Sequence, residues 1–242
     1  MAEFILVAGT FHGGWYWNPI KDLLLQEGHI VHAPSLTGLE GPIESKSINL
    51  ETHIQDILNI IENKKLTEVI LVGWSYGGMV ITGVADRNRE KISKLIYLDA
   101  QLPTPSQREW DLLPSKDQAT TLDQCLDGLN IFPNDWLREH EPRVHPHPLA
   151  TKLQPLDYDQ KAFDQIEKIF VFAEKWFHNP ESISPIRRSY EQAQRSVGWE
   201  TLSWPFGHDL VRECPEMVVE LLLHQAKKKA TSSVPIGPND PQ

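Results

Sequence analysis

The chain has 242 residues, of which 40% are hydrophobic and 23% charged, and its formal net charge at neutral pH is −10. This length allows one large α/β domain with a substantial core, or two small domains. The negative charge argues against a nucleic-acid surface and against binding to anionic membranes. No apolar run approaches the roughly 18 residues of a membrane span.

The first residues of the chain are apolar, but the run is short and carries Glu3 and no basic residue. This pattern indicates a first strand rather than a signal peptide. Cys125 and Cys214 match no metal-binding or redox spacing. We therefore expect a cytoplasmic protein with reduced thiols, although the sequence leaves a single disulfide open and gives no indication of the oligomeric state.

Six apolar runs of strand length are separated by helical patterns. The runs cover residues 4–9, 29–34, 68–73, 94–99, 168–173 and 198–204. Most of them are apolar throughout, as expected of strands that are covered on both faces. Between them, amphipathic segments such as 49–65 place their apolar residues on one helical face. This alternation predicts an α/β fold with a doubly wound, mainly parallel sheet.

The alternation is interrupted once, between Asp99 and Lys168, where the chain carries many prolines and aromatic residues but no clear buried strand. A segment of this length is too long for a plain loop, so we expect a helical cap inserted at residues 103–166. The core then comprises residues 1–102 and 167–229. Residues 230–242 are polar and proline-rich, and they predict a disordered tail.

The third apolar run leads into Gly73-Trp74-Ser75-Tyr76-Gly77, and a helical pattern follows directly. A G-x-S-x-G sequence between a strand and a helix predicts a sharp turn, in which small residues on either side of the serine avoid collisions. Such a turn raises the serine hydroxyl above the sheet, beside the amino end of the next helix. Ser75 is therefore the expected nucleophile, and the alternative is a serine that the turn merely tolerates.

A serine nucleophile needs a base to accept its proton and a group that orients the base. Of the ten histidines, His208 follows the last predicted strand and precedes the last helix, so the chain order becomes serine, acid, histidine. We predict that His208 is the base. By contrast, His145, His147 and His178 are interpreted as hydrogen-bonded surface or cap residues.

At these motifs the chain resembles the α/β-hydrolase superfamily, and in particular its compact esterase branch, which includes plant methylesterases, hydroxynitrile lyases and bacterial relatives. The resemblance extends over roughly residues 3–225, and its segments are FILVAGTFHGGWYW, HAPSLTGL, LVGWSYGGMVITGVADR, LIYLDAQLP and GHDLVRECPE. It implies a six-stranded parallel core, a helical cap and no cofactor. We also expect no metal, because no His, Asp or Glu cluster has ligand spacing.

The resemblance implies an oxyanion hole made of two backbone amides. One belongs to Tyr76, directly after the nucleophile, and the other to Thr10, in the loop after the first strand. The family usually has His-Gly before the second position, where this chain has Ala8-Gly9. Because the donor is a backbone N–H group, loss of that histidine need not abolish catalysis.

The acid of the triad has two candidates. Many α/β hydrolases carry it after the penultimate strand, but the matching position here is Trp176, and Glu174 lies two residues earlier. Some related enzymes place it at the end of the strand that follows the nucleophile helix, where this chain has Asp99. An acid at the end of a buried strand, next to the strand that leads into the serine turn, points toward the active-site crevice. We therefore favour Asp99 and keep Glu174 as the alternative.

The expected function is hydrolysis of a small or medium apolar ester, aromatic esters included, through an acyl-enzyme. The ester substrate is the only partner expected. An aromatic substrate pocket is expected from Phe11, Trp74, Trp110 and Trp136. The alternatives are a tailoring hydrolase or cyclase of a secondary-metabolite pathway and a non-catalytic small-molecule receptor. A hydroxynitrile lyase of this branch uses a threonine and a lysine where this chain has Gly9 and Asp209.

Overall fold

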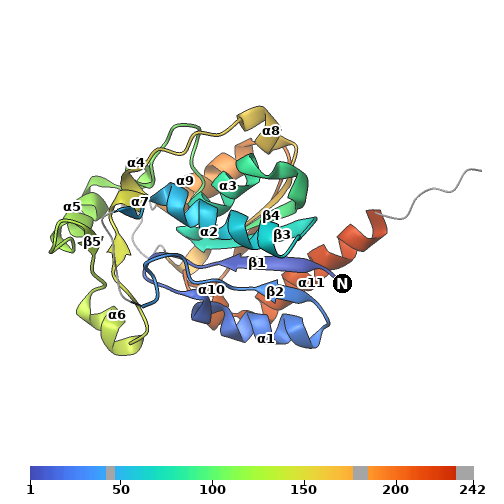
Figure 1. The fold of residues 1–242 in the computed structure, drawn as a ribbon, viewed down its shortest axis with the longest axis horizontal. Coiled ribbons are helices and arrows are strands. Elements are labelled where there is room, and N and C mark those ends of the chain that lie inside the picture. Colours follow the sequence, from blue (N-terminus) through green and yellow to red (C-terminus); the bar gives the residue numbers. More distant parts are fainter. Residues whose placement is uncertain (42–46, 177–184, 233–242) are drawn as a thin grey trace, which may run out of the picture.

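The computed structural model describes residues 1–41, 47–176 and 185–232. Its centre is a six-stranded sheet in the order β2-β1-β3-β4-β7-β8, in which all neighbouring strands are parallel (Figure 1). The strands are β1 (Glu3–Val7), β2 (Ile30–His32), β3 (Val69–Ser75), β4 (Ile92–Ala100), β7 (Glu167–Ala173) and β8 (Trp199–Trp204). Each strand overlaps one of the six predicted runs, so the predicted α/β fold with a parallel sheet is confirmed.

Helices cover both faces of this sheet (Figure 1). One layer consists of α2 (Leu50–Asn63), α3 (Gly77–Arg87) and α9 (Pro185–Arg195), and the other of α1 (Asn18–Gln26), α10 (Leu210–Glu213) and α11 (Pro215–Ser232). Short 3₁₀ turns lie at η1 (Gly14–Trp17), η3 (Arg89–Lys91) and η4 (Glu174–Trp176). Successive strand residues alternate between the two layers: Ile5 packs in the first and Leu6 in the second. Two apolar cores therefore hold the sheet from both sides.

Local signals in the sequence set the helix ends. Asn49 precedes α2, and its side chain accepts a hydrogen bond from the Thr52 N–H group at 3.1 Å, while the Thr52 hydroxyl contacts the Asn49 N–H group at 3.2 Å. This reciprocal pair satisfies two N–H groups that a helix start leaves without partners. In α1, Pro19 occupies the first turn, where its missing N–H group costs nothing.

The segment between β4 and β7 forms short helices and one short β-pair. They are α4 (Glu109–Leu112), α5 (Ser115–Asp123), β5 (Asn130–Ile131), α6 (Asp135–His140), β6 (His147–Pro148), α7 (Ala150–Leu153) and α8 (Gln160–Asp164). Most of them gather at one end of the molecule, beyond the carboxyl end of β1 (Figure 1). In contrast, α8 packs on α3, and its Phe163 is part of the core. The predicted cap, residues 103–166, thus includes one helix that covers a face of the sheet.

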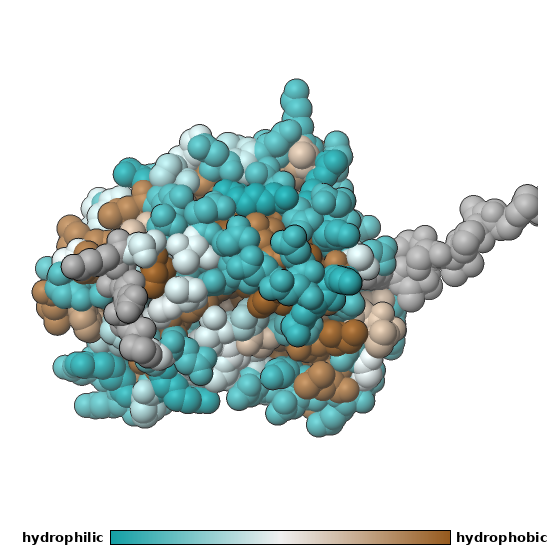
Figure 2. Space-filling view, in the orientation of Figure 1, coloured by the Kyte–Doolittle hydropathy of each residue, from teal (hydrophilic) through white to brown (hydrophobic). Residues whose placement is uncertain are grey.

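Apolar surface is visible at the end formed by α5 (Figure 2). Leu122 is 56% exposed there and Leu126 is 78% exposed. At the opposite end, α11 continues to Ser232, so residues 230–232 of the predicted disordered tail are helical instead. The rest of that tail, 233–242, lies outside the described residues, as does His178. Within the described ranges, no helix is long and apolar enough to cross a membrane, and Cys125 and Cys214 are both free thiols.

The close approach of α3 to β1 gives a test of the fold. A Cβ atom on Gly77 would lie 2.4 Å from the carbonyl oxygen of Val7, and backbone cannot move away cheaply. Gly77→Ala should therefore lower the free energy of unfolding by about 3 kcal/mol, measured by urea denaturation. Gly128→Ala is the control, because Gly128 has φ +71° but open space around it, and should cost about 1 kcal/mol. Equal losses would show that the α3–β1 contact tolerates a side chain.

Candidate active site

Ser75 lies at the apex of a strained turn at the carboxyl end of β3. Its φ angle is +55°, a conformation that non-glycine residues rarely adopt. The predicted need for small neighbours is visible: a Cβ atom on Gly73 would lie 2.7 Å from the Gly77 carbonyl oxygen. Ser75 itself is half-buried and thus retains access to solvent. The turn presents the serine at the edge of the sheet, as the G-x-S-x-G motif predicts.

Tyr76 links this turn to the first residue of α3. It is the N-cap residue, so the amino end of the helix begins directly beside Ser75. The Tyr76 side chain is fully buried, and its hydroxyl lies 2.9 Å from His53 Nδ1. Since His53 Nε2 contacts the Thr37 carbonyl oxygen, Nε2 carries the proton and Nδ1 accepts from the tyrosine. Burial lowers the pKa of His53 to about 4, so this histidine is neutral at pH 7.

Asp99 and His208 come together from distant parts of the chain. An Asp99 carboxylate oxygen, Oδ2, lies 2.6 Å from His208 Nδ1, and the other oxygen accepts from the Ala173 N–H group at 3.1 Å. The Asp99 side chain is fully buried. Burial raises the pKa of Asp99, and the hydrogen bonds from His208 and Ala173 oppose that rise. The carboxylate therefore fixes the orientation of the imidazole.

A register shift explains why Asp99 points into the site. Trp74 pairs with Leu98 and Ser75 pairs with Ala100, so Asp99 is the extra residue of β4 at this place. Its φ angle is +41°. An extra residue in a strand interrupts the alternation of side chains and redirects the bulged one. This irregularity lies beside Ser75, at the carboxyl edge of the sheet.

Glu174, the alternative acid, is hydrogen-bonded to Ser203. It is exposed on η4, and its carboxylate accepts a hydrogen bond from the Ser203 hydroxyl at 2.6 Å. The contact expected of a triad acid is made by Asp99 instead. The geometry thus favours Asp99 over Glu174 as the acid.

Trp74 does not occupy the position expected of a pocket residue. Its side chain is buried, its ring stacks on Tyr16 with centroids 4.2 Å apart, and its Nε1 donates to the His208 carbonyl oxygen at 2.7 Å. The expectation that Trp74 lines the substrate pocket is therefore corrected. The residue before the serine packs into the core on the side of the sheet opposite Tyr76, and from there it supports the histidine loop.

Thr10 lies in a tight turn after β1, in contact with the serine turn. The His12 N–H group donates to the Gly9 carbonyl oxygen at 3.2 Å, and a Cβ atom on Gly9 would lie 2.7 Å from the Ser75 Cβ atom. His12 Nδ1 donates to the Thr10 carbonyl oxygen at 2.7 Å. Because β1 and β3 are neighbours, the turn that carries Gly9 and Thr10 begins beside the serine turn. The connection after β1 leads to β2 on one side of the sheet, and the connection after β3 leads to β4 on the other. The edge between two such strands is the usual position of a binding site in an α/β sheet.

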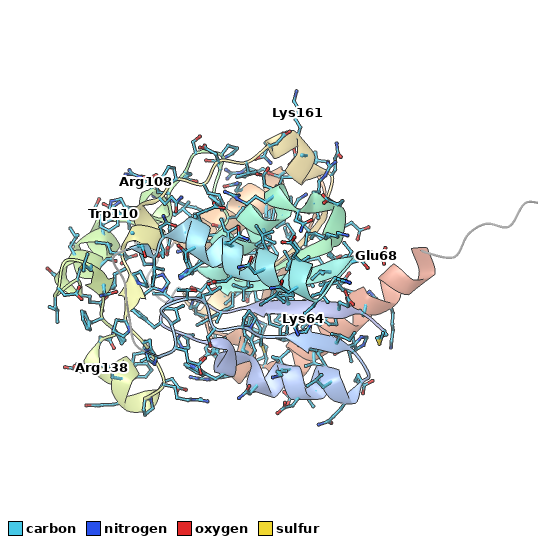
Figure 3. All side chains as sticks on the ribbon, viewed as in Figure 1. Lys64, Glu68, Arg108, Trp110, Arg138 and Lys161 are labelled. Atoms are coloured by element: carbon cyan, nitrogen blue, oxygen red, sulfur yellow. The ribbon has the colours of Figure 1, made fainter. Side chains whose placement is uncertain are left out.

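The remaining pocket candidates differ in their surroundings. Phe11 is half-buried, and its ring meets His147 edge-on with centroids 6.4 Å apart. Trp110 on α4 is also half-buried (Figure 3). Trp136 is 64% exposed and stacks on His140 of its own helix, and its place in the substrate pocket stays a prediction.

Sequence reasoning missed a set of buried polar residues around Tyr76. His147 was interpreted as a surface or cap residue, but it is fully buried, 4.8 Å from the Tyr76 ring centroid. Lys152 and Glu109 form a buried ion pair nearby. In the sequence, His147 and Lys152 stand in a proline-containing stretch with no clear helical or strand periodicity, which is too weak a signal to assign them. Within the described residues, no group of three His, Cys, Asp or Glu side chains is placed to hold a metal ion.

The acid assignment gives a direct prediction. Asp99→Asn keeps an acceptor for the Ala173 N–H group but favours the wrong tautomer of His208, so kcat for a p-nitrophenyl ester should fall by about 10⁴-fold. Glu174→Gln, the matched control, should cost less than about tenfold, because Glu174 is exposed and accepts its hydrogen bond from Ser203. The reverse order of losses would transfer the acid role to Glu174.

Known proteins resemble this chain over most of its length. Residues 4–233 match the model of the Alpha/beta hydrolase family. The chain is 34% identical to the carbendazim hydrolyzing esterase of Nocardioides sp. (strain SG-4G), over 92% of this chain and 98% of that protein. It is 37% identical to the alpha-hydroxynitrile lyase of Arabidopsis thaliana, but that match covers only 42% of this chain and 40% of the lyase.

Among solved structures, an extracellular alpha/beta-hydrolase from a Paenibacillus species superposes with a TM-score of 0.78, over 93% of this chain and 98% of that one. At 23% identity, this likeness shows the fold. The full-length match to the family and to a curated esterase shows more than the fold. This chain belongs to the alpha/beta hydrolase family, within the branch of compact esterases that also contains plant hydroxynitrile lyases.

Proposed function

We propose that this ester-hydrolysing member of the alpha/beta hydrolases works through an acyl-enzyme on Ser75, with His208 as base and Asp99 as the acid that orients it. One observation carries the proposal. The buried Asp99 carboxylate lies 2.6 Å from His208 Nδ1, at the edge of the sheet where the strained turn presents Ser75. A carboxylate at Nδ1 leaves Nε2 as the ring nitrogen that exchanges protons with the serine.

The proposed reaction has two halves. His208 Nε2 takes the proton of the Ser75 hydroxyl as the oxygen attacks the ester carbonyl carbon, and a tetrahedral oxyanion forms. The imidazolium then gives its proton to the leaving alkoxide, which departs as the alcohol. In the second half, His208 takes a proton from water, the resulting hydroxide attacks the acyl-enzyme, and the acid leaves as Ser75 recovers its proton.

Two backbone N–H groups are proposed to stabilise the oxyanion, those of Tyr76 and Thr10. Tyr76 is at the amino end of α3, where the helix dipole favours negative charge. Thr10 lies on the neighbouring strand connection, held by His12 through its carbonyl oxygen. Tyr76 follows Ser75 directly, and Gly9, the residue before Thr10, approaches the serine turn, which supports the proposal that the carbonyl oxygen of a bound ester reaches both donors.

The geometry around Gly9 and Asp209 disfavours the lyase alternative. A Cβ atom at position 9 would lie within 3 Å of Ser75 and the Trp74 ring, so the threonine that such lyases use does not fit there. Asp209 accepts a hydrogen bond from the Tyr16 hydroxyl at 2.6 Å, so an acidic side chain, and not the lysine of those lyases, occupies this position. Ester hydrolysis remains the function that these residues support.

We propose a small or medium apolar ester as substrate, with aromatic esters included. Phe11 and Trp110 are the half-buried aromatic residues of the predicted pocket. Turnover of a panel of p-nitrophenyl esters, methyl esters of aromatic acids and carbendazim would define the substrate class. Carbendazim is included because the full-length relative is named for its hydrolysis. Turnover by the purified protein would also separate an esterase from a receptor, and cyclised products would reveal a cyclase.

The nucleophile is tested by Ser75→Ala. The variant should fold, because alanine keeps the Cβ atom of the turn, but its turnover of a p-nitrophenyl ester should fall by about 10⁴- to 10⁶-fold. Covalent labelling by a fluorophosphonate should also disappear. Ser203→Ala is the control, because Ser203 lies on β8 and its hydroxyl donates to Glu174. A Ser75→Ala variant with wild-type turnover would refute the acyl-enzyme.

The support of His208 by Trp74 is tested by Trp74→Phe. Phenylalanine keeps an aromatic ring against Tyr16 but loses the N–H group that bonds the His208 carbonyl oxygen. We expect kcat/KM to fall by about three- to tenfold, the value of one such hydrogen bond. In Trp15→Phe, the control, the lost Nε1 has no hydrogen-bond partner among the described residues, so kcat/KM should change by less than about twofold. Similar losses in both variants would contradict the supporting role.

A further inference from the structure

A buried ion pair in the segment between β4 and β7 has no role in the mechanism above. Lys152 Nζ on α7 lies 2.5 Å from Glu109 Oε1 on α4. The two residues are 6% and 1% exposed. Moving such charges out of water costs several kcal/mol per ion, and a buried pair often stabilises a fold no better than apolar residues of the same size. The pair therefore calls for an explanation beyond stability.

The ammonium group of Lys152 contacts both residues of the proposed oxyanion hole. Nζ donates to the Thr10 hydroxyl oxygen at 3.2 Å, and it lies 5.8 Å from the centre of the Tyr76 ring. Glu109 is held in turn by Gln101, whose Nε2 donates to the same carboxylate oxygen at 2.8 Å. A chain of contacts thus runs from the residue after β4, through Glu109 and Lys152, to the turn that carries Thr10.

The turn at Thr10 needs such support. Phe11, the next residue, has a φ angle of +70°, which is strained for a side chain of this size. His12 holds the Thr10 carbonyl oxygen, and Lys152 holds the Thr10 hydroxyl oxygen. Two fixed points on one residue restrict its backbone angles, and hence the direction of its N–H group. An oxyanion donor acts only when it is aimed at the place where negative charge develops.

We propose that Lys152, oriented by Glu109, is a positioning residue that aims the Thr10 N–H group at the oxyanion. This inference rests on the proposed acyl-enzyme mechanism. It assigns to the inserted segment a part in catalysis besides covering the site, since α4 and α7 fix one wall of the oxyanion hole. The ion pair is not arranged for the greatest number of hydrogen bonds: Glu109 Oε2 and Gln101 Oε1 are buried with no partner among the described residues. A network that serves only stability would be expected to satisfy these atoms.

The test separates binding of the substrate from stabilisation of the oxyanion. Thr10→Val removes the acceptor but keeps the shape, whereas Thr10→Ser retains the hydroxyl. Lys152→Met combined with Glu109→Gln removes both charges together, so no unpaired ion is left. For each variant, kcat and KM are measured with a p-nitrophenyl ester. Inhibition is measured with a trifluoromethyl ketone, which forms an oxyanion on Ser75, and with the matching methyl ketone, which does not.

We expect kcat to fall by about 10- to 100-fold in Thr10→Val and in the charge-free double variant, less than the complete loss of an oxyanion donor. Affinity for the trifluoromethyl ketone should fall by the same factor, while KM and affinity for the methyl ketone stay within about threefold. Because Thr10→Ser keeps the hydroxyl that Lys152 contacts, its loss of kcat should be smaller than that of Thr10→Val. Adding Thr10→Val to the double variant should cause no further loss, because both changes remove one interaction.

Lys94→Met is the matched control for a buried lysine. Lys94 is also 6% exposed and bonds to Gln225 at 2.7 Å, but it lies near the opposite end of β4. Lys94→Met should lower the melting temperature without changing the ratio of the inhibition constants for the trifluoromethyl ketone and the methyl ketone. If the charge-free double variant does not fold, the kcat and inhibition constants of Thr10→Val alone test the positioning role. Wild-type kcat and inhibition in Thr10→Val would overturn the inference, as would additive losses.

The outcomes also separate this inference from the proposed function. If the wild-type protein neither turns over esters nor reacts with a fluorophosphonate at Ser75, the proposed mechanism fails. If the wild type is active and Ser75→Ala is inactive, but Thr10→Val behaves as wild type, only the positioning role of Lys152 fails.

Discussion

The positive φ angle of Ser75 depends on how closely the backbone at the start of α3 approaches the backbone at the end of β1 and directly after β4. Gly77 and Gly78 carry no Cβ atoms, so the first turn of α3 can lie directly against the carbonyl oxygens of Val7 and Gln101. That contact fixes where α3 begins, and the chain must then reverse between β3 and α3 within two residues. The serine takes the strained conformation because the packing on both sides allows no other. The position of the nucleophile is thus a consequence of backbone packing.

The same sheet edge gathers the other groups. Parallel strands end at one edge, so residues at the ends of β3 and β4 and in the connections after β1 and β8 meet there although they lie far apart in sequence. The irregular register of β4 directs Asp99 toward the loop that carries His208. Burial of this carboxylate is costly, and the hydrogen bonds from His208 and the Ala173 N–H group offset that cost. Phe11, Ser75 and Asp99, three of the non-glycine residues with positive φ, lie at this edge together with the buried carboxylate, and such strain is common at functional sites.

The inserted segment adds buried polar side chains to this edge. His147, Thr151 and Lys152 from the insertion surround Tyr76, together with His53 from α2. Burial lowers the pKa of His53 and of His147, so both rings are neutral and act through hydrogen bonds at pH 7. The layer beneath the serine turn is therefore held by directional bonds as well as by apolar contacts, which suits a group whose direction matters.

The sequence by itself determined the parallel sheet, the serine turn and the histidine after the last strand, because these depend on local periodicity and on glycine spacing. It left Asp99 and Glu174 open, placed Trp136 in a pocket and assigned Trp74 to the substrate. Those questions depend on where side chains point after the strands are paired: a one-residue register shift redirects Asp99, and the face of β3 decides that Trp74 packs on Tyr16. Lys152 and Glu109 carry no local signal, because they lie 43 positions apart and become partners only when α4 and α7 pack together. The tertiary structure alone decided these contacts, since sequence patterns encode the faces of elements and not the distances between them.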